Sequence, residues 1–265
     1  DEVLSQIREW TLQQKSKQAV LLDEILESLR DKGIFLQTRL DVHQGGGLGL
    51  RSSLVAFAEK ILPEIKVEII DTPEKMAKLE SGRIYVYVRL KDRFTILQWP
   101  ETFDRLIKLP AGIAEVENHF ILAEKLVATA AAFFFKDDVV LESFPFKVIR
   151  DADFKIDPNV DPDSLIEMVE AEVKNRGRKP LVRLEIDGPS HSEGALTLAA
   201  ALKLHPRNVY RYDLPLDLRI LWRLYGMPEA QPYRNKPFSP RLYEDMGALV
   251  ERIAAKDILL HYPFD

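Results

Sequence analysis

The chain has 265 residues, of which 46% are hydrophobic and 30% charged, a balance that excludes an intrinsically disordered protein. Its 37 Lys and Arg residues against 42 Asp and Glu residues give a net charge of −5, which argues against a nucleic-acid-binding surface covering the whole domain. It has no Cys and no apolar run long enough to span a bilayer, so disulfides, thiolate metal sites and a membrane span are excluded and we expect a soluble cytoplasmic protein.

The first 31 residues are predicted to form one amphipathic helix that ends before Gly33. Their apolar residues recur in steps of three and four, the spacing of one helical face. A single helix cannot bury such a stripe by itself. We therefore expect the stripe to pack on the rest of the chain, on helices outside this sequence or on a second subunit, most simply in a two-fold homodimer. The stripe residues are Val3, Ile7, Trp10, Leu21, Ile25 and Leu29.

A glycine-rich loop from Gly45 to Gly49 precedes a predicted helix over 51–62. Backbone N–H groups at such a position bind anions in phosphate-binding loops. A P-loop, however, requires Gly-Lys followed by Ser or Thr, and this loop contains no Lys. The pattern therefore favours a flexible connection over a ligand site.

The segment up to residue 150 reads mainly as strands, because apolar and polar residues alternate along it. Residues 83–90 and 93–99 form a predicted hairpin, and the apolar, Ala-rich run over 121–135 is predicted to be a buried helix. The other expected elements are a strand over 66–70, a short helix over 73–79, and strands over 105–109 and 144–150.

Beyond residue 150, helices and strands alternate irregularly. Four prolines in 227–240 predict an extended linker there. The other expected elements are helices over 162–175, 191–204, 216–225 and 241–255, and strands over 181–186, 208–212 and 257–261. The whole pattern predicts an α+β fold, in which an N-terminal helical segment precedes a mixed-sheet domain with helices.

Candidate site residues are few. Asp151 and Asp153 leave a predicted strand one residue apart and project from the same side. They could share a cation, but pairing with the neighbouring Arg150 is favoured, which gives these three residues a structural or interface role. The five histidines lie at no metal-ligand spacing. We therefore predict no catalytic residue and no metal site in this chain.

Several segments resemble the long, histidine-phosphorylating polyphosphate kinases of bacteria. The residues Phe146-Lys-Val-Ile-Arg-Asp-Ala-Asp153 are similar to that family's Phe-Arg-Val-Thr-Arg-(Asn/Asp)-Ala-(Asp/Glu), and Val182-Arg-Leu-Glu-Ile186 to its Val-Arg-Leu-Glu-Val strand. Leu214-Pro-Leu-Asp-Leu218, after Val209-Tyr210, and Asp257-Ile-Leu-Leu-His-Tyr-Pro-Phe264 also resemble family segments, in the same order.

This resemblance implies three regions. Residues 1–35 correspond to a helix of the family's N-terminal bundle and 36–226 to its middle or head domain. Residues 227–265 then form a Pro-rich linker, a helix and the first strand of the next, catalytic domain.

The resemblance also implies an activity. The intact family enzyme transfers the terminal phosphate of ATP to polyphosphate through a phosphohistidine, with Mg²⁺. None of its catalytic residues corresponds to a position of this sequence. We therefore expect the chain to supply scaffold and subunit contacts, and to be inactive by itself. The alternative is a stand-alone, non-catalytic binding or interaction module related to the family.

Overall fold

The computed structural model describes residues 2–38, 47–151, 179–188, 192–212, 214–236 and 249–257, together with residues 170 and 239. The chain divides into two compact units, 1–223 and 224–265. The predicted helix over 162–175 apart from residue 170, residues 241–248 of the last predicted helix and residues 258–261 of the closing strand lie outside the described residues, as do residues 45 and 46 of the glycine-rich loop. Residues 47–49 of that predicted loop are helical instead, because the helix predicted from residue 51 begins at Gly47.

Helices and strands follow in an irregular order, as an α+β fold requires. The strands are β1 (Ile34–Gln37), β2 (Glu68–Ile70), β3 (Ile84–Arg89), β4 (Phe94–Gln98), β5 (Leu106–Lys108), β6 (Asn118–Leu122), β7 (Glu142–Arg150), β8 (Leu181–Asp187) and β9 (Val209–Tyr212). The α-helices are α1 (Glu2–Arg30), α2 (Gly47–Ile61), α3 (Pro73–Met76), α4 (Ala123–Thr129), α6 (Glu193–Ala201), α7 (Ile220–Gly226) and α8 (Leu249–Ala255). The 3₁₀ helices are η1 (Leu62–Glu64), η2 (Ala131–Phe134), η4 (Pro206–Asn208) and η5 (Pro228–Tyr233).

Two mixed sheets organise the first unit, which confirms the predicted fold class. The larger sheet has the strand order β2-β4-β3-β7-β8-β9, and only its β8–β9 pair is parallel. Helix α6 connects these two strands, as a parallel pair needs a crossover. The smaller sheet has the order β1-β6-β5, in which β1 and β6 are parallel. The predicted hairpin is confirmed, since β3 and β4 pair antiparallel.

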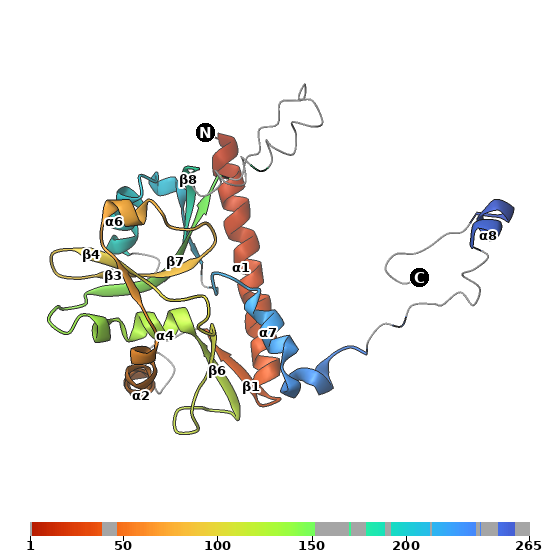
Figure 1. The fold of residues 1–265 in the computed structure, drawn as a ribbon, viewed down its shortest axis with the longest axis horizontal. Helices are drawn as coiled ribbons and strands as arrows, with labels where there is room; N and C mark the ends of the chain where they lie inside the picture. Colours follow the sequence, from red (N-terminus) through yellow and green to blue (C-terminus); the bar gives the residue numbers. More distant parts are fainter. Residues whose placement is uncertain are drawn as a thin grey trace. The chain divides into compact units, whose positions relative to one another are not determined.

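The larger sheet separates two hydrophobic cores, and α4 and α6 lie on opposite sides of it (Figure 1). On one face, Val86, Val88 and Leu97 pack with apolar residues of α2 and α4. On the other face, Tyr85, Tyr87 and their neighbours pack with residues of α6. Alternate strand residues point to opposite faces, so a run of apolar residues feeds both cores. Within the described residues, no helix has the length and apolar character that a bilayer span needs.

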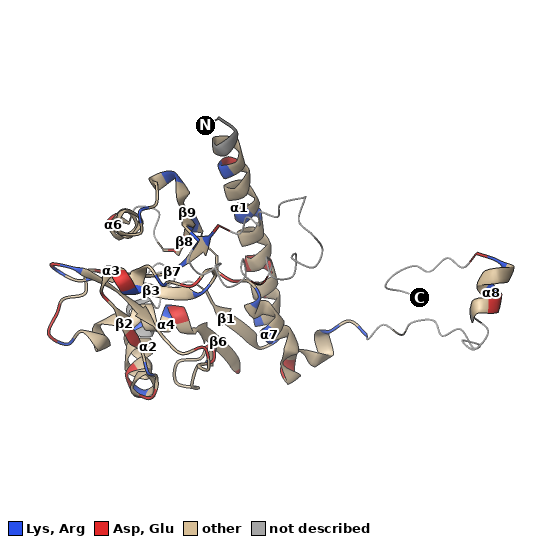
Figure 2. Cartoon of the chain, turned by 45° about the horizontal axis from the view of Figure 1, so that its top comes forward, with Lys and Arg blue, Asp and Glu red and all other residues tan. Residues whose placement is uncertain are grey.

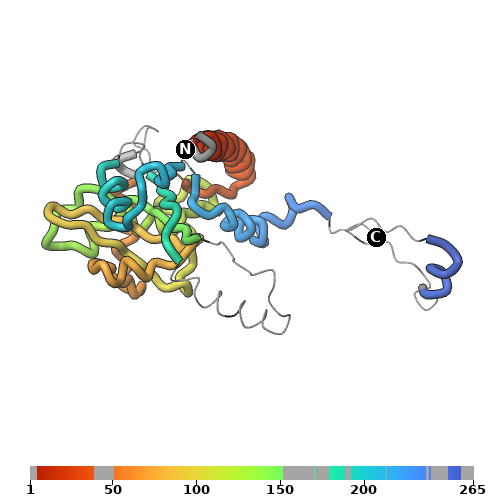
Figure 3. Tube along the Cα trace, turned by 90° about the horizontal axis from the view of Figure 1, so that it is seen from above, coloured from red at the N-terminus to blue at the C-terminus, as the bar shows by residue number. Residues whose placement is uncertain are grey.

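Helix α1 lies along one side of the first unit (Figure 3). Its Leu22 and Leu26 are buried, at 5% and 4% exposure. The chain turns after the helix at Gly33, whose φ of +77° lies in the left-handed region that favours glycine. An adjacent stripe stays open to solvent. The exposed apolar side chains of α1 are Ile7 at 51%, Trp10 at 62%, Val20 at 60%, Leu21 at 57% and Ile25 at 41%.

Two predicted elements were wrong in part. The run over 121–135 is not one helix: residues 121–122 belong to β6, and α4 begins at Ala123. Strand β6 is buried along its whole length, so it is apolar on both sides and shows no alternation that could separate it from a buried helix. The segment 227–240 is not wholly extended, because its residues 228–233 form η5. Pro228 stands at the helix start, where the fixed φ of proline suits a first turn.

Strand β1 was not predicted from the sequence, helix α6 is shorter than predicted and helix α7 begins later than predicted. Residues 34 and 35 were predicted to end the helical segment 1–35 and no element was predicted for 36–37, but residues 34–37 form a strand that pairs with β6. Helix α6 occupies only Glu193–Ala201, because Ser192 caps its start by accepting a hydrogen bond from the Ala195 N–H. Helix α7 begins at Ile220 rather than at residue 216.

The start of α6 is tightly packed against the sheet. The Gly194 N–H donates to Glu142 Oε2 at 3.1 Å. A Cβ atom on Gly194 would lie only 2.6 Å from that oxygen and 2.6 Å from Tyr87 Cε1. The absence of a side chain at this position therefore allows α6 to approach β3 and β7.

Candidate functional site

Ionised side chains gather on one face of the β7–β8 pair. Strand alternation sends Leu184 and Ile186 of β8 into the second hydrophobic core. It sends Glu185 and Asp187 to the opposite face, where each is only 6% exposed. A buried carboxylate is strongly destabilising unless a cation pairs with it, so the partners of these two residues define the site.

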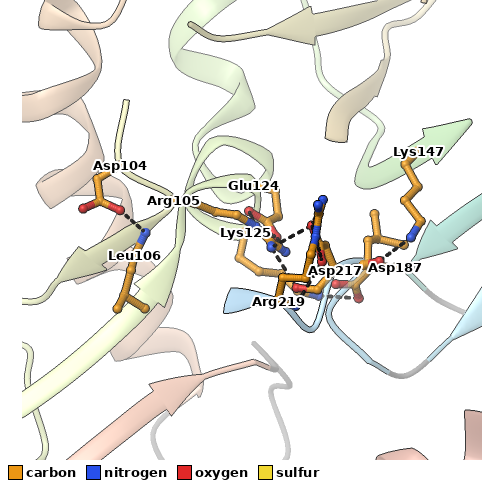
Figure 4. A network of polar contacts seen from close by, with 10 residues as sticks. Asp104, Arg105, Leu106, Glu124, Lys125, Lys147, Asp187, Asp217 and Arg219 are labelled. Atoms are coloured by element: carbon orange, nitrogen blue, oxygen red, sulfur yellow. Dashed lines mark hydrogen bonds and ion pairs between the residues drawn. The ribbon is translucent and has the colours of Figure 1, made fainter. Parts of the chain in front are cut away.

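Two lysines provide those partners, and Figure 4 shows Lys125 with Asp187, and Lys147 nearby. Lys147 Nζ of β7 lies 2.8 Å from Glu185 Oε2 and donates to the Leu216 carbonyl at 2.5 Å. Lys125 Nζ of α4 lies 2.5 Å from Asp187 Oδ1. The two ion pairs thus connect β7, β8 and α4 with the turn that follows β9.

A third ion pair ties the small sheet to the same turn. Arg105, just before β5, donates from Nε to Glu124 Oε1 at 2.9 Å and from Nη2 to the same oxygen at 2.5 Å. Glu124 is fully buried. Arg105 Nη1 also donates to the Asp217 carbonyl at 2.8 Å. This planar, multiply bonded geometry is the one that an arginine provides and a lysine does not.

Asp217 lies at the solvent-facing end of this network, where it pairs with the exposed Arg219. Its carboxylate accepts from Arg219 Nε and Nη2, the latter at 2.6 Å. Burial raises the pKa of the Asp217 carboxyl, but hydrogen bonds from Arg219 and the charges of Arg219 and Arg105 outweigh it, so the pKa lies below its usual value. Asp217 therefore stays ionised.

Basic and aromatic residues continue the polar face toward α1. The guanidinium groups of Arg8 and Arg183 lie 4.9 Å and 4.6 Å from the ring centroid of Tyr210. Arg8 Nη2 also donates to the Val209 carbonyl at 2.9 Å. These cation–π contacts and hydrogen bonds attach α1 to the β9 edge of the sheet.

Of the three candidate residues predicted from sequence, Arg150 is the best defined. Its guanidinium donates to the carbonyls of Leu79 at 3.1 Å and 2.9 Å, Lys179 at 2.6 Å and Ala77 at 2.7 Å. Burial lowers the pKa of Arg150, while the Tyr85 charge opposes the shift. Arg150 thus fastens β7 to the turn after α3 and to the residues before β8.

The predicted pairing of Arg150 with the two aspartates stays a prediction. The Asp151 N–H donates to the Pro180 carbonyl at 3.0 Å, and Asp153 lies outside the described residues.

Two histidines lie among the described residues, and both serve local structure. His119 is fully buried, accepts at Nδ1 from the Glu115 N–H at 3.0 Å, and contacts Gln37 Oε1 through Nε2 at 3.2 Å. His205 Nδ1 accepts from the Arg207 N–H at 3.1 Å. An imidazole nitrogen that accepts a backbone hydrogen bond is not available as a nucleophile, so neither Nδ1 suits phosphoryl acceptance.

The network is suited to fixing structure rather than to chemistry. In the part of the chain that the structure describes, no three His, Asp or Glu side chains are placed to hold a metal ion. Mg²⁺ is held by carboxylate oxygens, and the carboxylates of Glu124, Glu185 and Asp187 each bind a lysine or arginine instead.

Sequence reasoning missed the network itself. One signal of it is that Arg183, Glu185 and Asp187 stand at alternate positions of the predicted strand over 181–186 and just after it.

Comparison with known proteins gives a consistent result. Residues 51–224 match the family model described as the polyphosphate kinase middle domain. The chain is 27% identical over 287 residues to the polyphosphate kinase of Mycobacterium tuberculosis strain H37Rv, an alignment that covers 100% of this chain and 38% of that protein. With the polyphosphate kinase of Mycolicibacterium paratuberculosis it is 28% identical over 267 residues, covering 93% and 36%.

A solved structure shares the fold. The crystal structure of the polyphosphate kinase from Porphyromonas gingivalis superposes with a TM-score of 0.65 at 23% identity, over 99% of this chain and 38% of that one. The chain therefore spans about two fifths of the length of the relatives that it matches.

Proposed function

The chain belongs to the polyphosphate kinase family, of which it contains the middle domain, and we propose on this premise that it is the central, non-catalytic part of such a kinase. The intact enzyme transfers the terminal phosphate of ATP to polyphosphate through a phosphohistidine and uses Mg²⁺. It acts in the cytoplasm as a homodimer. This chain contributes the scaffold and the subunit contacts.

One observation carries the proposal: the described ionised groups inside the domain are used to hold its own elements together. Lys125, Lys147 and Arg105 each bind a carboxylate that is at least nine-tenths buried. Because these cations are already paired, they are not available to neutralise the charge of a phosphoryl group during its transfer. Phosphoryl transfer requires such neutralisation. We assign no Mg²⁺ ligand to the described residues.

The proposed regions follow the same reasoning. Residues 1–35 provide the helix that leads into the domain, 36–226 form the middle domain, and 227–265 lead to a catalytic domain. Arg150, Asp151 and Asp153 keep a structural or interface role in this scheme.

The proposal predicts that the chain alone transfers no phosphate. Purified chain is incubated with γ-labelled ATP, Mg²⁺ and a polyphosphate primer, and acid-insoluble label and protein-bound label are counted. Both are expected at the level of a heat-denatured control. Label on a histidine of this chain, or labelled polymer, contradicts the proposal.

A further inference from the structure

The segment that follows α7 is coiled, although its prolines predict an extended linker. In Figure 2 the ribbon continues in helical turns beyond α7, where η5 follows. A 3₁₀ helix of six residues is uncommonly long, because the hydrogen bonds of such a helix are poorly aligned. Pro232 lies inside η5 and has no N–H to donate. The backbone of η5 therefore needs support from a side chain to keep this shape.

Arg234, directly after η5, provides this support. Its Nη2 donates to the Met227 carbonyl at 2.7 Å, so the side chain reaches back over the whole of η5. Met227 is the N-cap residue of η5 and makes no side-chain hydrogen bond to the first turn. Its carbonyl also accepts from the Ala230 N–H at 3.1 Å, so both lone pairs of that oxygen are used. The hydrogen bond from Arg234 thus closes the segment from its end to its start.

A second contact of Arg234 connects η5 with α7. The guanidinium carbon lies 5.1 Å from the centroid of the Tyr225 ring, and Tyr225 belongs to the last turn of α7. A cation within about 6 Å of an aromatic face is attracted by the ring. A planar guanidinium can stack on a ring while its edge donates hydrogen bonds. One side chain of the second unit therefore contacts the end of α7 and the start of η5 together.

We propose that Arg234 is a clasp that fixes the shape of residues 225–234. With the clasp closed, this segment is a short, stiff spacer. With the clasp open, its prolines favour an extended tether. The closed clasp therefore limits how freely the chain moves after residue 234. The role of the spacer in leading to a catalytic domain rests on the proposed function, whereas the clasp itself rests on the contacts of Arg234.

Limited proteolysis measures how often the clasp opens, because the cleavage rate follows the population of the opened segment. The full 265-residue chain is treated with a glutamate-specific protease, and cleavage after the exposed Glu229 is followed by mass spectrometry. The variants are Arg234→Met, which removes the charge and the donors, and Arg234→Lys, which keeps the charge without the planar fork. The matched control is Lys236→Gln, which removes an exposed cation of the same segment. Synthetic peptides of residues 222–240 with the same substitutions give the intrinsic cleavage rates.

Relative to its peptide, Arg234→Met is expected to be cleaved about tenfold faster than the unchanged chain, as the loss of one hydrogen bond from a charged donor predicts. Lys236→Gln is expected to match the unchanged chain, and Arg234→Lys to lie between the two. Equal rates in all four proteins overturn the clasp, as does an unchanged chain that is cleaved as fast as its peptide. Faster cleavage of Arg234→Met at glutamates of the first unit also overturns it, because the effect is then global unfolding. The assay contains no nucleotide and no polyphosphate, so its result is separate from that of the labelled-ATP assay.

Discussion

Replacement of Arg105 by Met removes the cation that faces the most buried carboxylate of the network. Glu124 is fully buried, and Arg105 supplies it with three hydrogen bonds. Breaking a buried pair by removing one partner lowers the free energy of unfolding by about 3–5 kcal/mol, because the remaining charge is left uncompensated. For a domain of this size, each kcal/mol lowers the melting temperature by roughly 2–4 °C, so a fall of roughly 6–20 °C is expected.

Calorimetry on matched variants tests this reasoning. Arg219→Met removes an arginine whose side chain is 82% exposed, and pairs of that kind contribute about 0.2–1 kcal/mol. The variant Arg105→Met with Glu124→Leu is expected to recover part of the lost stability, since no unpaired charge remains. The account is refuted if Arg105→Met melts no lower than Arg219→Met, or if the second substitution lowers stability further.

Three more results are expected. Burial, which is the largest effect, and the Arg30 charge lower the pKa of His119, although Glu115 opposes them. Below about pH 6.5 the unfolded chain therefore binds a proton on this imidazole that the folded chain does not bind. The contribution of His119 to the free energy of unfolding should be fully present above that pH and be lost as the pH falls toward the lowered pKa of the folded state. Urea unfolding at pH 7.5 and 5.5 should show a smaller loss of this free energy in His119→Gln than in the unchanged chain. Gly194→Ala should lower the free energy of unfolding by about 1–3 kcal/mol through overpacking, whereas Gly112→Ala, where a Cβ meets nothing within 4 Å, should match the unchanged chain in the same titration. Light scattering should detect a dimer that Ile25→Lys dissociates, because Ile25 lies in the exposed apolar stripe of α1; a monomer at every concentration would exclude this interface.

Much of the fold is predictable from sequence because local periodicity controls it. Helix α1 follows from apolar spacing and from Gly33, whose positive φ ends it. The β3–β4 hairpin follows from two runs rich in β-branched and aromatic residues on either side of a short polar turn. Strand β6 does not follow, because it is buried on both faces and its neighbours β1 and β5 come from distant parts of the chain. Tertiary pairing decided its conformation.

The ion-pair network was beyond sequence reasoning for a related reason. Lys125 and Asp187 are 62 positions apart, and Arg105 reaches a carbonyl 112 positions away. A charged residue in a sequence gives no indication of which opposite charge it will meet. Glu124 stands in an apolar, Ala-rich run, and that contrast was the available sign that it is buried with a partner.

The most direct measurement is ATP-dependent polyphosphate synthesis by a chimera. Residues 51–224 of this chain replace the matching region of the Mycobacterium tuberculosis polyphosphate kinase, and acid-insoluble phosphate is measured beside the parent enzyme and a chimera carrying Arg105→Met. If this chain is a kinase middle domain, the chimera synthesises polymer and the Arg105→Met chimera loses activity at the temperature where its middle domain unfolds. A chimera that unfolds as cooperatively as the parent, yet makes no more polymer than the parent enzyme lacking its middle region, contradicts the account.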